Sequence, residues 1–174
     1  MVVLFRLVGA LVGSGLRPRI GPFDVAALRM RVWPNDLDLN MHASSGRYVS
    51  FMDIGRVDLL VRTGVFRKVV ARGWRPIVGG SMISYRRSLF LFERFTVKSR
   101  VVGWDEKWLY FDHVIEKRNG ELAMKAKVRG LLRGPNGNVP PRDLALLAGY
   151  DGDSPPLPES IVRWREAEAR EQTA

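Results

Sequence analysis

The sequence predicts an α+β fold in which an antiparallel sheet wraps around one long central helix. Residues 45–63 carry apolar side chains at helical spacing on nearly every side, so other elements must cover this helix. Strands are expected where apolar and polar residues alternate, both before and after the helix. These strands fall within residues 27–33, 77–91, 95–102, 108–117 and 121–133.

Local signals support this order of elements. Pro34-Asn35-Asp36 ends the first strand, Gly64 stands where a helix cap is expected, and Asn119-Gly120 is typical of a hairpin turn. Asp58 and Arg62 lie one helical turn apart, and we expect them to pair on the exposed side of the central helix.

The length of 174 residues fits one domain with a sizeable core. We place the folded domain at residues 27–134, after an apolar and basic segment at 1–26. A Pro-rich extension follows at 135–174, and it contains a short amphipathic helix near 159–171.

Residues 1–16 need separate treatment because they are mostly apolar. Arg6 and three glycines interrupt them, and a membrane-spanning helix needs about 20 apolar residues. We therefore expect a packed or interfacial segment, with weak membrane association through residues 1–16.

The composition restricts the partners. The chain has 28 Lys and Arg against 18 Asp and Glu, a net charge of +10, which favours a ligand that carries phosphates. The basic residues are scattered and no nucleic-acid-binding motif is present, so nucleic acid is not expected. The absence of cysteine, with only two histidines, argues against disulfides, thiolate nucleophiles and a metal site, and agrees with a cytoplasmic location.

The run Asp36-Leu37-Asp38-Leu39-Asn40-Met41-His42 stands directly before the central helix. A carboxylate in this position can act as a general base or a nucleophile, while free amides at the helix start stabilise negative charge on a carbonyl oxygen. This layout suits cleavage of an acyl bond. The alternative is that Asp38 only caps the helix and His42 only satisfies the loop.

These residues also carry a family resemblance. The pattern Asp-x-Asp-x-x-x-His, followed by Arg47-Tyr48 and then Asp53 and Arg56, resembles the 4-hydroxybenzoyl-CoA thioesterase group of hotdog-fold proteins. Arg86-Arg87-Ser88-Leu89 and Gly103-Trp104-Asp105-Glu106 are similar to the branch that contains thioesterase superfamily member six. The sequence departs from the usual pattern at three positions, with Met41 in place of Gly and Ser44 and Ser45 in place of an Asn pair.

The resemblance implies a hotdog-fold acyl-CoA thioesterase that hydrolyses an acyl thioester to free acid and coenzyme A. Asp38 would attack the thioester carbonyl or activate a water molecule. Asn40 and His42 would orient Asp38 or the carbonyl, with simple satisfaction of the loop as the alternative for His42. Tyr48 would close the acyl pocket or donate its hydroxyl, with core packing as the alternative.

Backbone amides around His42, Ala43 and Ser44 are candidates to hold the substrate oxyanion, and Ser44 and Ser45 stand in for the Asn pair of the family. Arg86 and Arg87 are candidate contacts for coenzyme A phosphates, and strand alternation would send them to opposite faces of the sheet. Asp53 pairs with Arg56 and His113 lies mid-strand, and for these three residues we expect structural roles.

No cofactor is expected beyond the coenzyme A of the substrate, and the acyl carrier can be coenzyme A or acyl carrier protein. A homodimer or tetramer is expected, because hotdog subunits commonly pair their sheets edge to edge. The competing interpretation is a hotdog protein that binds acyl-CoA or lipid without turnover, because Met41, Ser44 and Ser45 depart from the family pattern.

Overall fold

The structure is a computed structural model that describes residues 2–171. Within this range, six antiparallel strands form one sheet in the order β1-β3-β4-β5-β2, and β6 pairs with the end of β5. The strands are β1 (Ala26–Arg31), β2 (Arg75–Tyr85), β3 (Arg94–Trp104), β4 (Leu109–Lys117), β5 (Leu122–Gly134) and β6 (Gly137–Val139). The α-helices are α1 (Val2–Gly15), α2 (Ser45–Arg62), α3 (Phe66–Ala71), α4 (Pro141–Leu147) and α5 (Glu159–Glu171).

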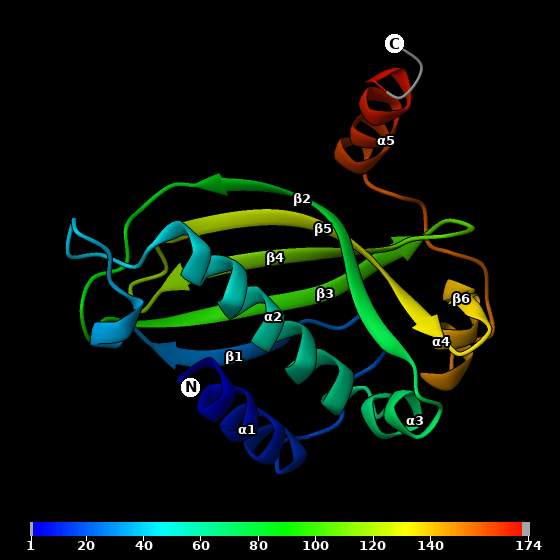
Figure 1. Cartoon of the computed structure of the whole chain (residues 1–174), viewed down its shortest axis with the longest axis horizontal. Coiled ribbons are helices and arrows are strands. Elements are labelled where there is room, and N and C mark those ends of the chain that lie inside the picture. Colours follow the sequence, from blue (N-terminus) through cyan, green and yellow to red (C-terminus); the bar gives the residue numbers. More distant parts are fainter. Residues whose placement is uncertain (1, 172–174) are drawn as a thin grey trace.

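The sheet curls around α2, which confirms the predicted α+β architecture (Figure 1). Phe51, Met52 and Leu59 of α2 are almost completely buried in a core that β3, β4 and β5 complete. A Cβ atom at Gly55 would lie 2.5 Å from the hydroxyl oxygen of Ser99 on β3. Because glycine has no such atom, α2 can pack directly against the sheet.

The element boundaries follow local chemistry. The central helix begins at the predicted Ser45, and Gly64 takes the left-handed φ of +79° that the predicted cap requires. The strand expected within residues 77–91 ends at Tyr85, because the amides of Arg86 and Arg87 both donate to the carbonyl of Ala123. The chain then leaves the ladder and forms a loop beside the start of α2.

Segments beyond the expected domain core also pack against it. Val139 of β6 and Leu144 of α4 belong to the main core. The predicted C-terminal helix is α5, and its Ile161 is fully buried. The guanidinium of Arg129 on β5 lies over the rings of both Trp108 and Trp164, at 4.8 and 5.2 Å from the ring centroids. These cation–π contacts join α5 to the outer face of the sheet.

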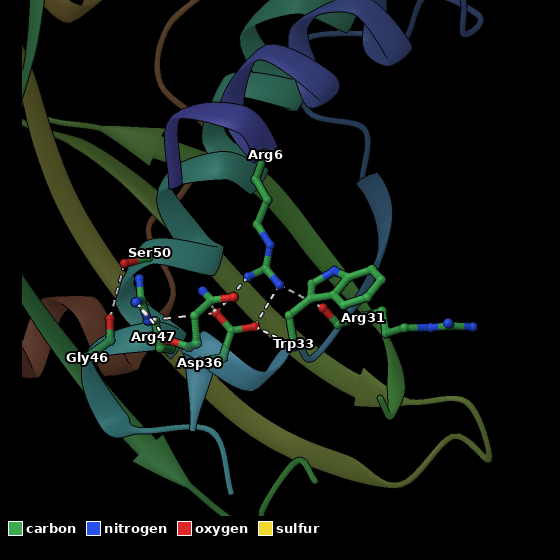
Figure 2. Close-up of polar contacts among 8 residues, drawn as sticks. Arg6, Arg31, Trp33, Asp36, Gly46, Arg47 and Ser50 are labelled. Carbon is green, nitrogen blue, oxygen red and sulfur yellow. Dashed lines mark hydrogen bonds and ion pairs between the residues drawn. The ribbon is translucent and has the colours of Figure 1, made fainter. Parts of the chain in front are cut away.

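Helix α1 packs along α2 and β1, where Ala10 contacts Leu28 and Ile54 (Figure 1). Polar contacts to a completely buried carboxylate strengthen this packing. Arg6 donates from Nη1 to Asp36 Oδ1 at 2.9 Å and from Nη2 to Asp36 Oδ2 at 2.6 Å (Figure 2). Its Nη2 also donates to the carbonyl of Arg31 at 2.9 Å. This bidentate geometry is the strongest form of a charge-assisted hydrogen bond.

The other end of α1 is anchored at Asp58. The Ser14 hydroxyl donates to Asp58 Oδ1, and the Arg17 guanidinium lies 3.4 Å from the same oxygen. Asp58 was expected on the exposed side of α2, but its side chain is fully buried. The expectation is wrong because α1 covers this side of α2, which the helical pattern alone did not reveal. Arg62 still lies 3.9 Å from Asp58.

The outer side of α1 carries the exposed apolar side chains Val8 and Val12, and the exposed Leu16 follows the helix. Within residues 2–171, no helix has the length and apolar character to cross a membrane. Weak membrane association through residues 1–16 and a cytoplasmic location stay predictions.

A chain of polar groups crosses the interface between α2 and the sheet. Arg56 of α2 lies 3.1 Å from His113 Nε2 on β4, and His113 Nδ1 lies 2.8 Å from the Ser99 hydroxyl. Since guanidinium groups only donate, His113 Nε2 must be the acceptor and the ring must be neutral. Burial, and then the nearby Arg56 charge, lowers the pKa of His113 from its ordinary 6.5 to about 3.

This shift predicts acid sensitivity of the fold. Between its folded and unfolded pKa values, His113 binds a proton only in the unfolded chain, so its contribution to stability is complete above pH 6.5 and is lost as the pH falls towards 3. His113→Gln should remove this contribution. In denaturant unfolding, the wild-type free energy of unfolding should fall by about 2 kcal/mol more than that of the variant between pH 7 and pH 5. If the free energy of unfolding changed equally with pH in wild type and in His113→Gln, the lowered pKa of His113 would be contradicted.

The Arg6–Asp36 contact gives a second prediction. Arg6→Met keeps most of the side-chain length but removes the bidentate cation from the buried carboxylate of Asp36, which keeps the Trp33 amide and the more distant Arg47, at 3.7 Å. Urea unfolding should show a loss of about 3 kcal/mol, typical of breaking one partner of a buried pair. Arg142→Met, at an exposed pair with Asp151, should change stability by less than about 0.5 kcal/mol. The double change Arg6→Met and Asp36→Asn should recover part of the loss, and an additive result would refute the pairing.

Candidate active site

The motif before α2 forms a compact loop that starts from the buried Asp36. The Ser44 amide donates to the Asp36 carbonyl at 2.9 Å, and Leu37 and Ala43 form an isolated bridge across the loop. The side chain of Asp36 is meanwhile held by Arg6 and by the Trp33 amide (Figure 2). Asp36 therefore closes the base of the loop, and the residues between Leu37 and Ala43 project from it.

Asp38 and His42 lie at this projecting end. Asp38 Oδ1 accepts a hydrogen bond of 2.9 Å from the Asn40 amide and lies 3.5 Å from His42 Nδ1. The Asp38 amide donates to the His42 carbonyl at 3.0 Å, which holds the two residues together. About a third of each side chain is exposed. The pair is therefore preorganised and open to a ligand.

Met41 shows how the loop tolerates its departure from the family pattern. Its φ is +58°, in the left-handed region that glycine adopts easily, and its side chain is 62% exposed. The backbone thus takes a glycine-like conformation at a cost of roughly 1–2 kcal/mol. The methionine side chain points into solvent and leaves the Asp38–His42 contact intact.

The amides around the start of α2 are divided between two roles. The Ala43 amide donates to the Leu89 carbonyl at 2.8 Å, and the Ser44 amide donates to Asp36. These two groups hold the loop in place. The first helical residues, Ser45 and Gly46, carry amides of the kind that has no acceptor within a helix. These amides, with the positive end of the helix dipole, are available to an anionic oxygen.

Tyr48 fastens the loop after β2 to α2. Its hydroxyl donates to the Arg87 carbonyl at 3.3 Å and accepts from the Leu89 amide at 3.1 Å. The side chain is 4% exposed, and burial raises its pKa, so the phenol stays protonated. Tyr48 thus sets the position of residues 86–89 beside Asp38.

The site residues surround one cavity of about 280 Å³, which we call the loop cavity. Its lining consists of Asp38, His42, Ala43, Ser45, Tyr48, Tyr85, Arg86, Arg87 and Ser88. Nearly all the residues proposed from sequence therefore come together. Asn40 and Ser44 lie outside the lining, although the Asn40 amide contacts Asp38 and Ser44 precedes the helix.

Arg86 and Arg87 both line the loop cavity. The prediction from strand alternation, which placed them on opposite faces of the sheet, is therefore wrong. They follow the last residue of β2, so the alternation of the strand no longer applies to them. Arg87 Nε donates to Glu121 at 3.0 Å, and this hydrogen bond lowers the pKa of Glu121. Arg86 is exposed beside the cavity and is the better placed of the two for a phosphate.

Sequence reasoning missed two residues that line the loop cavity, Tyr85 and Ser88. The Tyr85 hydroxyl donates to the Ser45 carbonyl at 3.3 Å, and its ring packs edge-on against Tyr48. No local signal pointed to this contact, because forty positions separate the partners and only the fold brings them together. Among the residues that the structure describes, no group of three acidic or histidine side chains is arranged for a metal ion.

A second cavity continues along α2, and we call it the apolar groove. It has a volume of about 380 Å³ and lies between α2, β2, β4, β5 and α4. Its lining consists of Asp53, Arg56, Val57, Leu60, Pro76, Ile77, Val78, Leu109, Phe111, Val128, Gly130, Leu131, Leu132 and Leu144. An apolar chain would fit this lining far better than a polar one.

The chain resembles known proteins over most of its length. Residues 32–164 match the Thioesterase-like superfamily. Protein THEM6 of Danio rerio is 32% identical over 136 residues, which cover 77% of this chain and 65% of that protein. Thioesterase lcsJ of Purpureocillium lilacinum is 26% identical over 163 residues, which cover 79% of this chain and 52% of that protein. The chain thus spans less than two thirds of either relative.

Solved structures support the fold. The probable thioesterase YbaW of Escherichia coli superposes with a TM-score of 0.64 at 21% identity, covering 70% of this chain and 94% of that one. This likeness confirms the predicted hotdog fold. The match to THEM6 confirms the resemblance to the branch of thioesterase superfamily member six. The chain belongs to the Thioesterase-like superfamily.

Proposed function

We propose that this protein is an acyl-CoA thioesterase that hydrolyses an acyl thioester to free acid and coenzyme A. The observation that carries the proposal is the shared cavity of the Asp38–His42 pair and the start of α2, in a chain of the Thioesterase-like superfamily. Thioester cleavage needs a nucleophile or a base, a site for the carbonyl group, and a helix terminus that stabilises the negative charge on the carbonyl oxygen.

Asp38 acts on the thioester carbonyl in this proposal. Its carboxylate either takes a proton from an attacking water or attacks the carbonyl itself, and the coenzyme A thiolate then leaves. In the second route the acyl group is left as an anhydride on Asp38, and water then hydrolyses this anhydride to the free acid and restores the carboxylate. The Asn40 amide and His42 hold the carboxylate in position. The negative charge that develops on the carbonyl oxygen is stabilised by the free amides of Ser45 and Gly46 at the positive end of α2.

The remaining contacts assign the two ends of the substrate. Arg86 binds a phosphate of coenzyme A at the exposed rim of the loop cavity, while Arg87 is held by Glu121. The acyl chain extends from the loop cavity into the apolar groove, whose lining is mostly apolar. An acyl carrier protein would present the same thioester and is the alternative carrier.

Replacement of Asp38 tests the mechanism. Asp38→Asn keeps the shape of the side chain and removes the basic carboxylate, so thiol release should fall about a hundredfold or more. The assay follows thiol release from short, medium, long and aromatic acyl-CoAs. Asp151→Asn changes an exposed carboxylate remote from the cavity and should retain the wild-type rates. Unchanged hydrolysis by Asp38→Asn would refute the assigned role.

A second candidate function is binding of acyl-CoA or lipid without turnover. It is favoured by the internal use of the Ala43 and Ser44 amides and of the Tyr48 hydroxyl, which leaves few donors for an oxyanion. Tight binding of acyl-CoA by wild type with no thiol release from any substrate would establish this function in place of catalysis.

We propose a homodimer that pairs through β2. This strand is eleven residues long, lies at the edge of the sheet and pairs only with β5 among the described strands. Its Ile77 and Val78 are exposed although apolar. A long edge strand with exposed apolar side chains is a pairing site for another chain, and a second copy is the natural partner.

The proposed dimer can be tested by its mass in solution. Light scattering coupled to size exclusion should give wild type twice the chain mass of 19.7 kDa. Val78→Asp places a charge on the β2 edge and should yield monomer. Val12→Asp makes the same change at an exposed valine of α1 and should leave the dimer intact. A monomeric wild type would overturn the proposal, as would a Val78→Asp variant with wild-type mass.

A further inference from the structure

The apolar groove contains one charged pair. Asp53 and Arg56 are the only ionisable side chains among the described residues that line it. Arg56 is mostly buried, with 14% of its side chain exposed, whereas 55% of the Asp53 side chain is exposed. A pair in an apolar wall has a large desolvation cost, so its presence needs a reason.

The groove and the loop cavity lie along the same side of α2. Ser45, Val49, Asp53 and Val57 follow one another at intervals of four residues and therefore lie on one face of the helix. Ser45 lines the loop cavity, while Asp53 and Val57 line the groove. Val49, between them, is an exposed apolar residue. A chain that starts at the helix terminus can follow this face to Asp53.

Strand β2 accompanies the same path on the opposite side. Tyr85, at its end, lines the loop cavity, and Ile77 and Val78, near its start, line the apolar groove. These three side chains are exposed in the isolated chain despite their apolar surface. The helix and the strand that flank this path thus carry exposed apolar side chains, at Val49 and at Ile77 and Val78, and the Asp53–Arg56 pair lies at its far end.

The pair is held in place from behind. Arg56 donates to Asp53 and to the neutral His113, which is itself held by Ser99. These contacts use two of the five N–H groups of the guanidinium. Burial raises the pKa of Asp53 and lowers that of Arg56, as expected for charges in an apolar wall. The site thus presents a fixed donor beside a fixed acceptor.

We propose that Asp53 and Arg56 recognise a hydroxyl group on the acyl chain of the substrate. A hydroxyl both donates and accepts, so it can donate to the Asp53 carboxylate and accept from the Arg56 guanidinium at once. A carboxylate on the chain would be repelled by Asp53, and a plain hydrocarbon would displace water from the Asp53 carboxylate without replacing its hydrogen bonds. This inference rests on the proposed thioesterase function and names its substrate class.

The helix gives the position of that hydroxyl. Eight residues separate Ser45 from Asp53, which corresponds to about 12 Å along an α-helix. An extended chain advances roughly 3.5 Å for every three bonds, so the hydroxyl should lie about ten bonds from the thioester carbon. The matching probe is 10-hydroxydecanoyl-CoA, and decanoyl-CoA is its partner without the hydroxyl.

The experiment compares kcat/KM for these two probes. Wild type should prefer the hydroxylated probe by about tenfold or more, because only its hydroxyl replaces the hydrogen bonds that the charged pair makes to water. Asp53→Ala should reduce this preference to nearly one. Because the Asp53 side chain is more than half exposed, we expect Asp53→Ala to fold normally. Its melting profile by circular dichroism should match that of wild type, which would exclude a folding defect as the cause of a lost preference. Asp151→Ala, at an exposed Asp–Arg pair, should keep the wild-type preference.

Two further measurements keep this inference distinct from the proposed function. Hydrolysis of both probes at equal rates would overturn the hydroxyl site while the thioesterase function stands. If neither probe is hydrolysed, calorimetry measures the dissociation constants of the two probes instead. Equal dissociation constants would overturn the inference. An unchanged preference in Asp53→Ala together with loss of the dimer would assign the pair to the subunit interface and would also overturn it.

Discussion

The enclosure of α2 by the curled sheet is the constraint on which the rest of the structure depends. The absence of a side chain at Gly55 lets the helix approach Val97 and Ser99 of β3, and the core then buries Phe51, Met52 and Leu59 of the helix. Since the body of α2 is immobilised in the core, its N-terminus has a defined position in space. The Asp38 loop and the segment after β2 are built around that end, so the loop cavity inherits the rigidity of the core.

Two buried carboxylates extend this rigidity to the N-terminal helix. Asp36 and Asp58 are both inaccessible to solvent. Asp36 accepts from Arg6 of α1. Asp58 accepts from Ser14 of α1 and pairs with Arg17, just after that helix. Asp36 also accepts the Ser44 amide through its carbonyl. The docking of α1 and the shape of the Asp38 loop therefore both depend on Asp36. The N-terminal segment supports the candidate site, in addition to any contact that its outer face makes.

Polar groups within the core are arranged by the same packing. His113 accepts from Arg56 and contacts Ser99, so three elements share one network beneath the apolar groove. Burial forces the imidazole to be neutral, and neutrality makes it an acceptor for Arg56. The structural role expected for His113 thus has a consequence for the groove, because it fixes the orientation of a guanidinium in the wall.

The sequence by itself determined the order of the first strand, the central helix and strands β2 to β5, and the location of the candidate site, whereas α3, β6 and α4 were not predicted. The periodicity of residues 45–63, the alternating segments and the Asp38–His42 motif are local patterns, and each is set by neighbours along the chain. Tertiary structure alone decided the burial of Asp58 under α1, the approach of Tyr85 to Ser45 and the placement of both Arg86 and Arg87 at one cavity. These outcomes depend on which surfaces meet, and contacts between positions forty or more residues apart leave no trace in local spacing.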